Sequence, residues 1–309
     1  MSSSHSIKIY FSTHIPAVMN KYSCKIFVLF LLLFIIGGST LQTDYFPFDE
    51  FNYTGYSLDI SSETANARAT HWKTDGSEIY VVGRYTENVA SYSVSEPWNL
   101  STATFHSQYD LSNEFGSTNQ GSNAHGLYMR NDGQKMWVFN RTEIWGYTLT
   151  DPWDITTSVS SYYKNLRDFV RRGHDIDFHP DGNRIYIDDR DAQAVHEASL
   201  STPWDITTLQ WVFTLDISDQ EQAVRGIEII AEGTIMLLLD TDRKELLQYH
   251  LSEPWDLKTA TFHSTFDLSG QSSNPRGLSI HPDLHTFYIT GNNNQKIYQY
   301  SRNINRSVN

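Results

Sequence analysis

One short phrase recurs four times in this chain and constrains its fold more than any other feature. The copies are Pro97-Trp98-Asn99, Pro152-Trp153-Asp154, Pro203-Trp204-Asp205 and Pro254-Trp255-Asp256. The steps between them are 55, 51 and 51 residues. A fixed period of about 50 residues is the signature of a repeat architecture. The chain is therefore expected to consist of copies of one structural unit.

Four short strand-like runs make up each unit. In the last full unit they cover residues 261–267, 275–281, 287–291 and 296–300, and polar, Gly and Pro clusters separate them. Short runs rich in Ile, Tyr, Phe and Thr favour strands over helices. Four strands in about fifty residues are typical of one blade of a β-propeller. We call the strand that directly follows the Pro-Trp pair D, and the three strands after it A, B and C.

The turn between strands A and B carries a second repeated signal. Gly76, Gly133, Gly182 and Gly233 each follow an Asp or Glu in this turn. Glycine accepts the positive φ that tight hairpin turns need. Leu284 replaces the glycine in the fifth copy, and we expect that turn to have a different shape.

The number of strands predicts how the repeats close. There are five A-B-C triples but only four D strands in line, and the fifth D pattern lies at residues 51–61, after Pro47-Phe48-Asp49. We therefore predict an all-β, five-bladed propeller over residues 44–303, with residues 304–309 as a tail. The N-terminal strand completes the last blade, which removes an open edge. An open array, or half of a larger ring made by two chains, is the structural alternative.

The A-B segments resemble a known repeat. Arg276-Gly-Leu-Ser-Ile-His-Pro-Asp283 followed by Phe287-Tyr-Ile289 is similar to YVTN-type and related repeats of bacterial surface and phage propellers. The resemblance covers the five A-B segments and implies the fold, but no particular activity. Kelch-type paired glycines are absent, and the Gly-His pair of Trp-Asp repeats occurs only at Gly173-His174.

The N-terminal segment indicates export. Residues 27–36 form an unbroken apolar run, preceded by Lys21 and Lys25 and followed by small residues. This arrangement predicts a signal peptide over residues 1–40, with Met19 as a possible true start. We expect a secreted, extracellular or periplasmic protein, or a membrane-anchored one if the segment is not cleaved. Cys24, the single cysteine, lies inside this segment, so the remainder contains no disulfide.

Charge restricts the partners. The whole chain has a net charge of −13. A strongly acidic protein is a poor non-specific binder of nucleic acid or of anionic membranes. We expect a monomer that binds a glycan, an anionic small molecule or another protein, and no nucleic acid.

Five basic residues occupy one repeated position, despite this acidic composition. Each lies seven residues before the acid of its A-B turn, near the start of the inner strand: Arg68, His125, His174, Arg225 and Arg276. Propeller symmetry brings these five side chains to one mouth of the central channel. Convergent Arg and His favour an anion site, because guanidinium groups bind carboxylate, sulfate or phosphate bidentately. Alternatively, the basic residues neutralise nearby carboxylates.

Several carboxylates are available for that alternative. Asp177 and Glu228 follow three residues after His174 and Arg225, and they are also the one axial pair that we nominate as catalytic. The B-C loops carry five more acids, which are weak candidates for a Ca²⁺ site: Asp188, Asp189, Asp191, Asp240 and Asp242. Their spacing matches no known calcium loop, and solvated charge or local ion pairs explain them equally well. No other cofactor is predicted.

The remaining features allow more than one interpretation. The repeated tryptophans are expected to pack between blades, although flat rings could also stack on sugars. A polar insertion at residues 112–124 is expected on the same face as the basic residues, either as a binding loop or as a tolerated insertion. No nucleophile, zinc-protease or phosphate-loop motif occurs. The sequence favours a binding module, and a lactonase- or glycosidase-type hydrolase or a structural, adhesive repeat protein remain alternatives.

Overall fold

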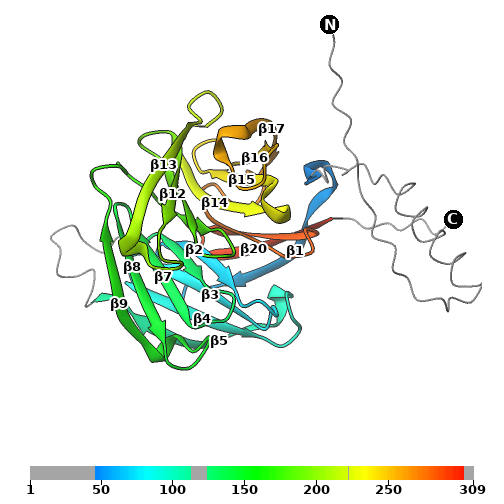
Figure 1. Cartoon of the computed structure of the whole chain (residues 1–309). Helices are drawn as coiled ribbons and strands as arrows, with labels where there is room; N and C mark the ends of the chain where they lie inside the picture. Colours follow the sequence, from blue (N-terminus) through cyan, green and yellow to red (C-terminus); the bar gives the residue numbers. More distant parts are fainter. Residues whose placement is uncertain (1–45, 113–123, 222, 303–309) are drawn as a thin grey trace, which may run out of the picture. The chain divides into compact units, whose positions relative to one another are not determined.

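Five four-stranded antiparallel sheets form a ring, which confirms the five-bladed propeller (Figure 1). The computed structural model describes residues 46–112, 124–221 and 223–302. The predicted signal segment, the tail at 304–309 and residues 113–123 of the polar insertion lie outside the described residues. Within the part described, no helix is long and apolar enough to span a membrane.

The strands follow the predicted order within each blade. The inner (A) strands are β2 (Ala67–Trp72), β6 (Gly126–Met129), β10 (Ile176–Phe178), β14 (Val224–Ile230) and β18 (Pro275–Ile280). The B strands are β3 (Glu78–Gly83), β7 (Lys135–Asn140), β11 (Arg184–Asp189), β15 (Ile235–Asp240) and β19 (Thr286–Gly291). The C strands are β4 (Asn88–Val94), β8 (Glu143–Leu149), β12 (Ala194–Leu200), β16 (Glu245–Leu251) and β20 (Lys296–Arg302). The outer (D) strands are β5 (Ala103–Asp110), β9 (Ser158–Asn165), β13 (Leu209–Asp216), β17 (Ala260–Asp267) and β1 (Phe51–Asp59).

The N-terminal strand closes the ring as predicted. Strand β1 pairs with β20, with Tyr53 opposite Tyr300 and Leu58 opposite Ile297. In Figure 1 the blue N-terminal strand lies beside the red C-terminal one. A short 3-10 helix, η1 (Phe48–Glu50), precedes β1 and contacts β17 of the neighbouring blade. The helices before the other D strands make the equivalent contact, so Pro47-Phe48-Asp49 is the fifth copy of the phrase.

The apolar residues pack between blades rather than in one central core. Each of five hydrophobic clusters draws its side chains from two neighbouring blades. Tyr80 and Val82 of blade 1, for example, pack with Met136 and Val138 of blade 2. Both faces of every blade are therefore covered, which explains why the B strands carry nearly continuous apolar runs and the C strands are buried along most of their length. The D strands alternate half-buried and exposed residues at the rim.

The inner strands contact one another in a closed cycle around the axis. The residue after the basic position is Ala or Gly in four blades and Asp175 in blade 3, and at two of the glycines the backbone of the neighbouring blade passes very close. A Cβ added at Gly277 would lie 2.3 Å from the carbonyl oxygen of Arg68, and one at Gly126 would lie 2.9 Å from Cα of Asp175. Glycine at these positions permits the close backbone approach that a five-bladed ring requires.

The Pro-Trp-Asp phrase forms a structural corner. The four tryptophans adopt φ values of 65–69°, and the N–H of each donates to the carbonyl of its own blade's turn glycine. Asn99 and its three Asp counterparts then cap a 3-10 helix: η2 (Leu100–Thr102), η3 (Ile155–Thr157), η4 (Ile206–Thr208) or η6 (Leu257–Thr259). The Tyr80 hydroxyl donates to the Trp153 carbonyl across the blade boundary. The tryptophans therefore pack between blades, as predicted.

The prediction that the fifth A-B turn has a different shape was wrong. Leu284 adopts a φ of 61°, close to the 71–76° of Gly76, Gly133 and Gly182, and its N–H donates to the His281 carbonyl in the same way. Blade 4 is the one that departs, because Ala231, Glu232 and Gly233 all have positive φ in η5 (Ala231–Gly233). Leu284 fits because blade 5 has no tryptophan at its corner, and it shares a core cluster with Phe48 instead.

Candidate functional site

The five predicted basic residues lie at matching positions on the inner strands. Arg68, Arg225 and Arg276 lie at the first or second residues of β2, β14 and β18, where the register with the B strand shifts. A β-bulge of this kind redirects a side chain out of the regular alternation. His125 and His174 come just before β6 and β10. We call Arg68, His125, His174, Arg225 and Arg276 the basic ring.

The structure brings these side chains together. Nη1 of Arg225 donates to Nε2 of His174 over 3.0 Å, and the His125 and His174 rings lie 4.5 Å apart between centroids. Because Arg225 donates to Nε2, neutral His174 carries its proton on Nδ1. Arg68 is close enough to Arg276 and Arg225 for both to lower its pKa. The ring therefore converges from all five blades on one end of the channel.

Burial separates this ring from an ordinary charged surface. Arg68, His125 and His174 are only 5%, 2% and 3% exposed. Nε and Nη1 of Arg68 and of Arg276, and both ring nitrogens of His125, have no hydrogen-bond partner among the described residues. None of the three ring arginines forms an ion pair in that part of the chain. No described carboxylate therefore pairs directly with a ring arginine, and Asp188 and Asp242 act on Arg225 only from beyond ion-pair distance.

Burying these basic groups together disfavours their charged forms, as their lowered pKa values indicate. Burial, together with the nearby Arg276, lowers the pKa of Arg68 to about 8, and burial lowers that of Arg276 to about 9. Burial, assisted by Arg225, also lowers the pKa of His174 well below its usual value, and burial with His174 does the same for His125. Buried positive charge without a counterion is unfavourable, and a bound anion would relieve it.

Three further arginines extend the positive charge outward. Arg84, Arg141 and Arg190 are the first residues after strands β3, β7 and β11. Arg84 and Arg141 contribute to lowering the pKa of His125, and Arg190 contributes to lowering that of Arg225. The sequence carried a signal for them, since one arginine follows the B strand in each of the first three blades. The interpretation of these B-C loops rested on their acidic residues, so the arginines were not predicted as part of the site.

A pocket of about 520 Å³ continues this basic region between blades 2 and 3. We call it the arginine pocket; its charged lining consists of Arg141, Arg167, Arg171, Arg172 and Asp191. Arg167 pairs with Glu143 at 3.2 Å and Arg172 with Asp191 at 3.6 Å. Among the described residues, Arg141 and Arg171 form no ion pair, and Nε of Arg141 is buried without a partner. The pocket therefore has an excess of positive charge.

The acidic candidates for a metal site hold the backbone instead. Asp188 accepts hydrogen bonds from the N–H groups of His174 and Asp175, which fixes the start of the short strand β10. Asp189 accepts from the N–H groups of Arg171 and Arg172. Although burial alone would raise it, hydrogen bonds from His196 and these N–H groups hold the pKa of Asp189 below its usual value.

The other three acids lie in ion pairs and turns. Asp240 accepts from the N–H groups of Asp242 and Arg243, while Asp191 and Asp242 lie 3.5 Å and 3.8 Å from Arg190 nitrogens. Within residues 46–112, 124–221 and 223–302, no group of three or more His, Cys, Asp or Glu is placed to hold a metal ion.

Asp177 and Glu228 form a second layer, three residues further along the inner strands. Asp177 accepts from the N–H groups of Phe178 and of Ile229 in the adjacent strand β14, at 2.7 Å and 2.8 Å. Burial raises the pKa of Asp177 to about 7, and burial with the Asp177 charge raises that of Glu228. The two carboxyls therefore interact, while both oxygens of Asp177 bind backbone.

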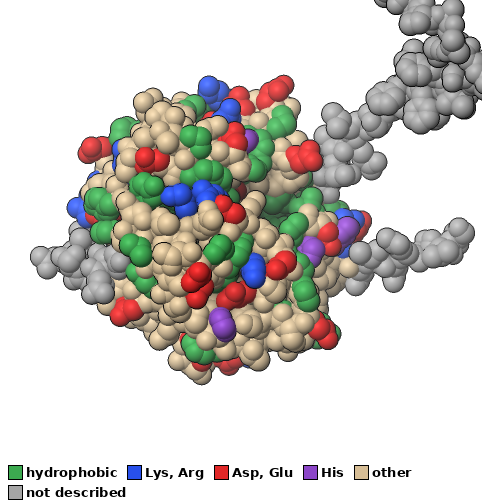
Figure 2. Space-filling view, turned by 60° about the horizontal axis from the view of Figure 1, so that its bottom comes forward, with side chains coloured by type: hydrophobic (Ala, Val, Ile, Leu, Met, Phe, Trp, Pro, Cys, Tyr) green, Lys and Arg blue, Asp and Glu red, His purple; other side chains and the backbone are tan. Residues whose placement is uncertain are grey.

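Charged side chains elsewhere are spread over the surface. Figure 2 shows acidic side chains scattered over one face, with Lys and Arg side chains gathered at one place near its middle. The excess of acid in this chain therefore does not form a single patch on the face shown. A local concentration of buried arginine contrasts with this background.

The sequence matches no protein family and no curated protein. Solved structures that it resembles include a protein of unknown function from Desulfotomaculum acetoxidans (14% identity, TM-score 0.44, 74% of this chain). They also include a candidate 6-phosphogluconolactonase from Bacteroides uniformis (12% identity, TM-score 0.45, 75% of this chain). A luciferin-regenerating enzyme is a third example (11% identity, TM-score 0.47, 79% of this chain). The matches cover 63%, 65% and 94% of those chains, so this chain spans less than two thirds of the first two.

Proposed function

We propose that this propeller is a secreted binding module that holds an anionic ligand in the basic ring at the axial mouth. The observation that carries the proposal is the set of buried Arg and His nitrogens without described partners. A carboxylate, sulfate or phosphate group would accept hydrogen bonds from several of them at once. Charge-assisted, bidentate bonds from arginine are among the strongest that proteins form with such groups.

The other expectations enter as parts of this proposal. Export follows from the signal-like segment at residues 1–40, and a monomer suffices because one chain supplies all five ring positions. The similarity to YVTN-type repeats is compatible with a surface role. A glycan or small molecule would reach side chains as buried as these more directly than a protein partner would, and no cofactor is required for binding.

Hydrolysis is the second candidate, and the geometry favours it less. A glycosidase needs one carboxyl to donate a proton and another to act as base or nucleophile. Burial raises the pKa of both Asp177 and Glu228, which suits a proton donor but not its ionised partner. However, both oxygens of Asp177 accept backbone hydrogen bonds, which leaves them poorly placed to reach a substrate.

Removing the ring charges tests the proposal. The variant Arg68→Met with Arg225→Gln and Arg276→Gln should lose binding of inorganic sulfate, phosphate and galacturonate, measured by calorimetry. It should also unfold at a higher temperature than the wild type without ligand, because it removes buried positive charge that lacks a counterion. Arg130→Gln is the matched control, since Arg130 pairs with Asp132 in an exposed turn on the opposite face.

Two results would contradict the proposal. Unchanged anion binding by the triple variant would exclude the ring as the site. A large loss of stability in that variant, with no anion bound by the wild type, would show that the arginines serve the scaffold. Hydrolysis of a sugar or lactone that disappears in Asp177→Asn would favour the enzyme instead.

A further inference from the structure

The loop between β9 and β10, residues 166–173, separates two surface hollows. Leu166 and Val170 anchor it, each 1% exposed in the core between blades 2 and 3. Its basic residues, Arg167, Arg171 and Arg172, line the arginine pocket on one side. Phe169 lines a groove of about 390 Å³ on the other side. One loop therefore presents cations and an aromatic ring to adjacent surfaces.

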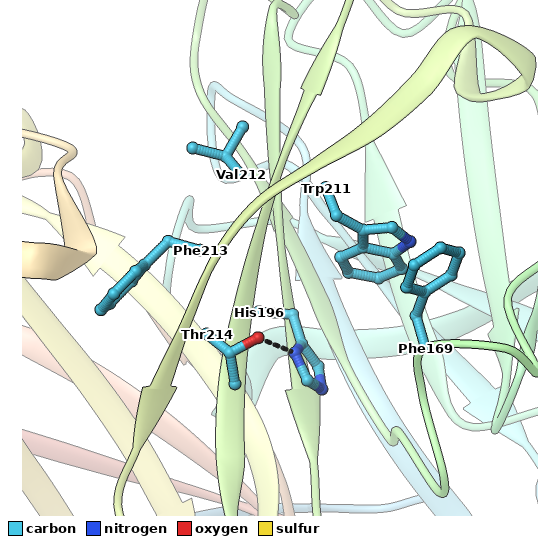
Figure 3. A pocket seen from close by; sticks show the side chains of 6 residues that line it. All are labelled: Phe169, His196, Trp211, Val212, Phe213 and Thr214. Carbon is cyan, nitrogen blue, oxygen red and sulfur yellow. Dashed lines mark hydrogen bonds between the residues drawn. The ribbon is translucent and has the colours of Figure 1, made fainter.

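The groove contains a pair of tilted aromatic rings, Phe169 and Trp211, which we call the aromatic shelf (Figure 3). The Phe169 ring lies beside the Trp211 indole with 4.7 Å between centroids and 36° between planes. Phe169 is 55% exposed and Val212 is 45% exposed, although both are large apolar residues. Trp211 is partly buried and supports Phe169, whose exposed ring offers an apolar surface of the kind that the face of a pyranose covers well.

The shelf and the arginine pocket are held in a fixed relation by Asp189. Its Oδ2 accepts from the N–H of Arg171 at 2.6 Å and lies 3.3 Å from Nε2 of His196. The other ring nitrogen of His196 lies 2.9 Å from the hydroxyl of Thr214, which also lines the groove. A buried carboxylate therefore joins the backbone of the pocket to the floor of the groove. Preorganised contacts lose less entropy when a ligand binds.

Positive charge also connects the arginine pocket to the basic ring. Arg141 lines the pocket, and its carbonyl accepts a hydrogen bond from the N–H of Gly173 at 2.8 Å. Gly173 directly precedes His174 of the ring, so the two places are adjacent. An anionic chain that enters the ring would meet further cations along this direction, and then the shelf.

We propose that loop 166–173 forms an outer subsite for a linear acidic oligosaccharide, whose anionic end occupies the basic ring. The aromatic shelf stacks against one pyranose, and Arg141 and Arg171, on the other side of the loop, bind the carboxylate or sulfate of a neighbouring sugar in the chain. This inference rests on the proposed function for the ring and adds the class of ligand. Aromatic stacking beside cations suits an acidic sugar, while the net charge of −13 disfavours nucleic acid.

Binding of matched sugars by two outer variants tests this subsite. The variants are Phe169→Ala and Arg171→Ala. The controls are Phe262→Ala, at an exposed residue of blade 4, and Lys73→Ala, at a residue that pairs with Asp75 in the A-B turn of blade 1. The probes are galacturonate, an oligogalacturonate hexamer, a heparin hexamer and a neutral cello-oligosaccharide hexamer. Each outer variant should weaken binding of an acidic hexamer by about tenfold, as expected for loss of one good contact. Galacturonate binding should change less than about twofold, which also shows that the variants are folded.

Three outcomes distinguish the two proposals. If both outer variants bind acidic hexamers as the wild type does, while the ring triple variant does not, the outer subsite is excluded and the anion site stands. If the ring variant retains binding of galacturonate and hexamers, the proposed function fails. If the neutral hexamer binds as tightly as the acidic ones, the assignment of an acidic ligand is wrong.

Discussion

The inner strands carry two layers of buried ionisable residues, one basic and one acidic. The basic ring lies at the mouth, and Asp177 and Glu228 lie three residues further along the same strands. Burial lowers the pKa of His174 and raises that of Asp177 to about 7. Each shift opposes the charged form, so the stability of the propeller must depend on pH through both layers.

The sign of the Asp177 contribution can be stated. Its pKa in the folded protein, about 7, exceeds the ordinary value of 3.8. The folded state therefore binds the proton more tightly, and this stabilisation is present below pH 4 and is lost as the pH rises through about 7. His125 and His174 act in the opposite sense, because their lowered pKa values cost stability as the pH falls below about 6.5.

Asp177→Asn should remove the first of these dependences. Relative to the wild type, the variant should gain about 2–4 kcal/mol in unfolding free energy between pH 4 and pH 8. Comparing the two proteins cancels the histidine contribution, which both retain. Urea unfolding across this pH range measures how the unfolding free energy of each protein changes with pH. The test compares this pH dependence rather than the absolute stability, because the amide also loses one backbone hydrogen bond. Parallel curves for the two proteins would contradict the raised pKa.

The corner of each blade acts as an element with two matched parts. A turn glycine with positive φ leaves room for the tryptophan of the same blade, and a Cβ added at Gly133 would lie 2.4 Å from Cδ1 of Trp153. In blade 5 the two parts change together, since Phe48 replaces the tryptophan and Leu284 replaces the glycine. The pair, rather than either residue alone, is the repeated feature.

Gly133→Ala should therefore be costly for two reasons. The alanine pays for a left-handed backbone, about 1–2 kcal/mol, and its Cβ displaces Trp153, which adds about 1–3 kcal/mol of overpacking. Gly55→Ala is the matched control, because Gly55 also has a positive φ, 88°, but nothing lies within 4 Å of its added Cβ. Chemical denaturation should show a larger loss for Gly133→Ala. Equal losses of unfolding free energy in the two variants would mean that the contact with Trp153 contributes nothing to the cost of Gly133→Ala.

Among the strands, turns and loops, the features that repeat from blade to blade were predicted from the sequence, and the irregular ones were not. The strands and the basic ring follow from a register that one repeat transfers to the next. The shape of the Leu284 turn was mispredicted because its partner, Phe48, lies at the other end of the chain. The aromatic shelf and Arg171 could not be predicted, since their positions depend on how one irregular loop folds over the core. Arg84, Arg141 and Arg190 were within reach of the same repeat argument.

The whole molecule depends on the pairing of its two ends. Strand β1 covers the edge of β20, and Phe46, Phe48 and Phe51 fill the core between blades 4 and 5. Phe51 also packs against Phe287, with 5.0 Å between ring centroids. No other described strand comes from a distant part of the sequence to complete its blade. Closure is therefore the one step in which folding must bring the two ends of the propeller together.

Removing residues 1–60 should open the ring at that point. The shortened chain loses β1 and three buried phenylalanines, and it exposes the edge of β20 to other molecules. We expect its unfolding temperature to fall by more than about 10 °C, with concentration-dependent association. Removing residues 1–44 is the control, because every strand pair then remains. A peptide of residues 46–60 added to the shortened chain should restore the loss in part, as seen by calorimetry and light scattering. A shortened chain that stays monomeric with an unchanged unfolding temperature would show that the four other blades hold the ring without its closing strand.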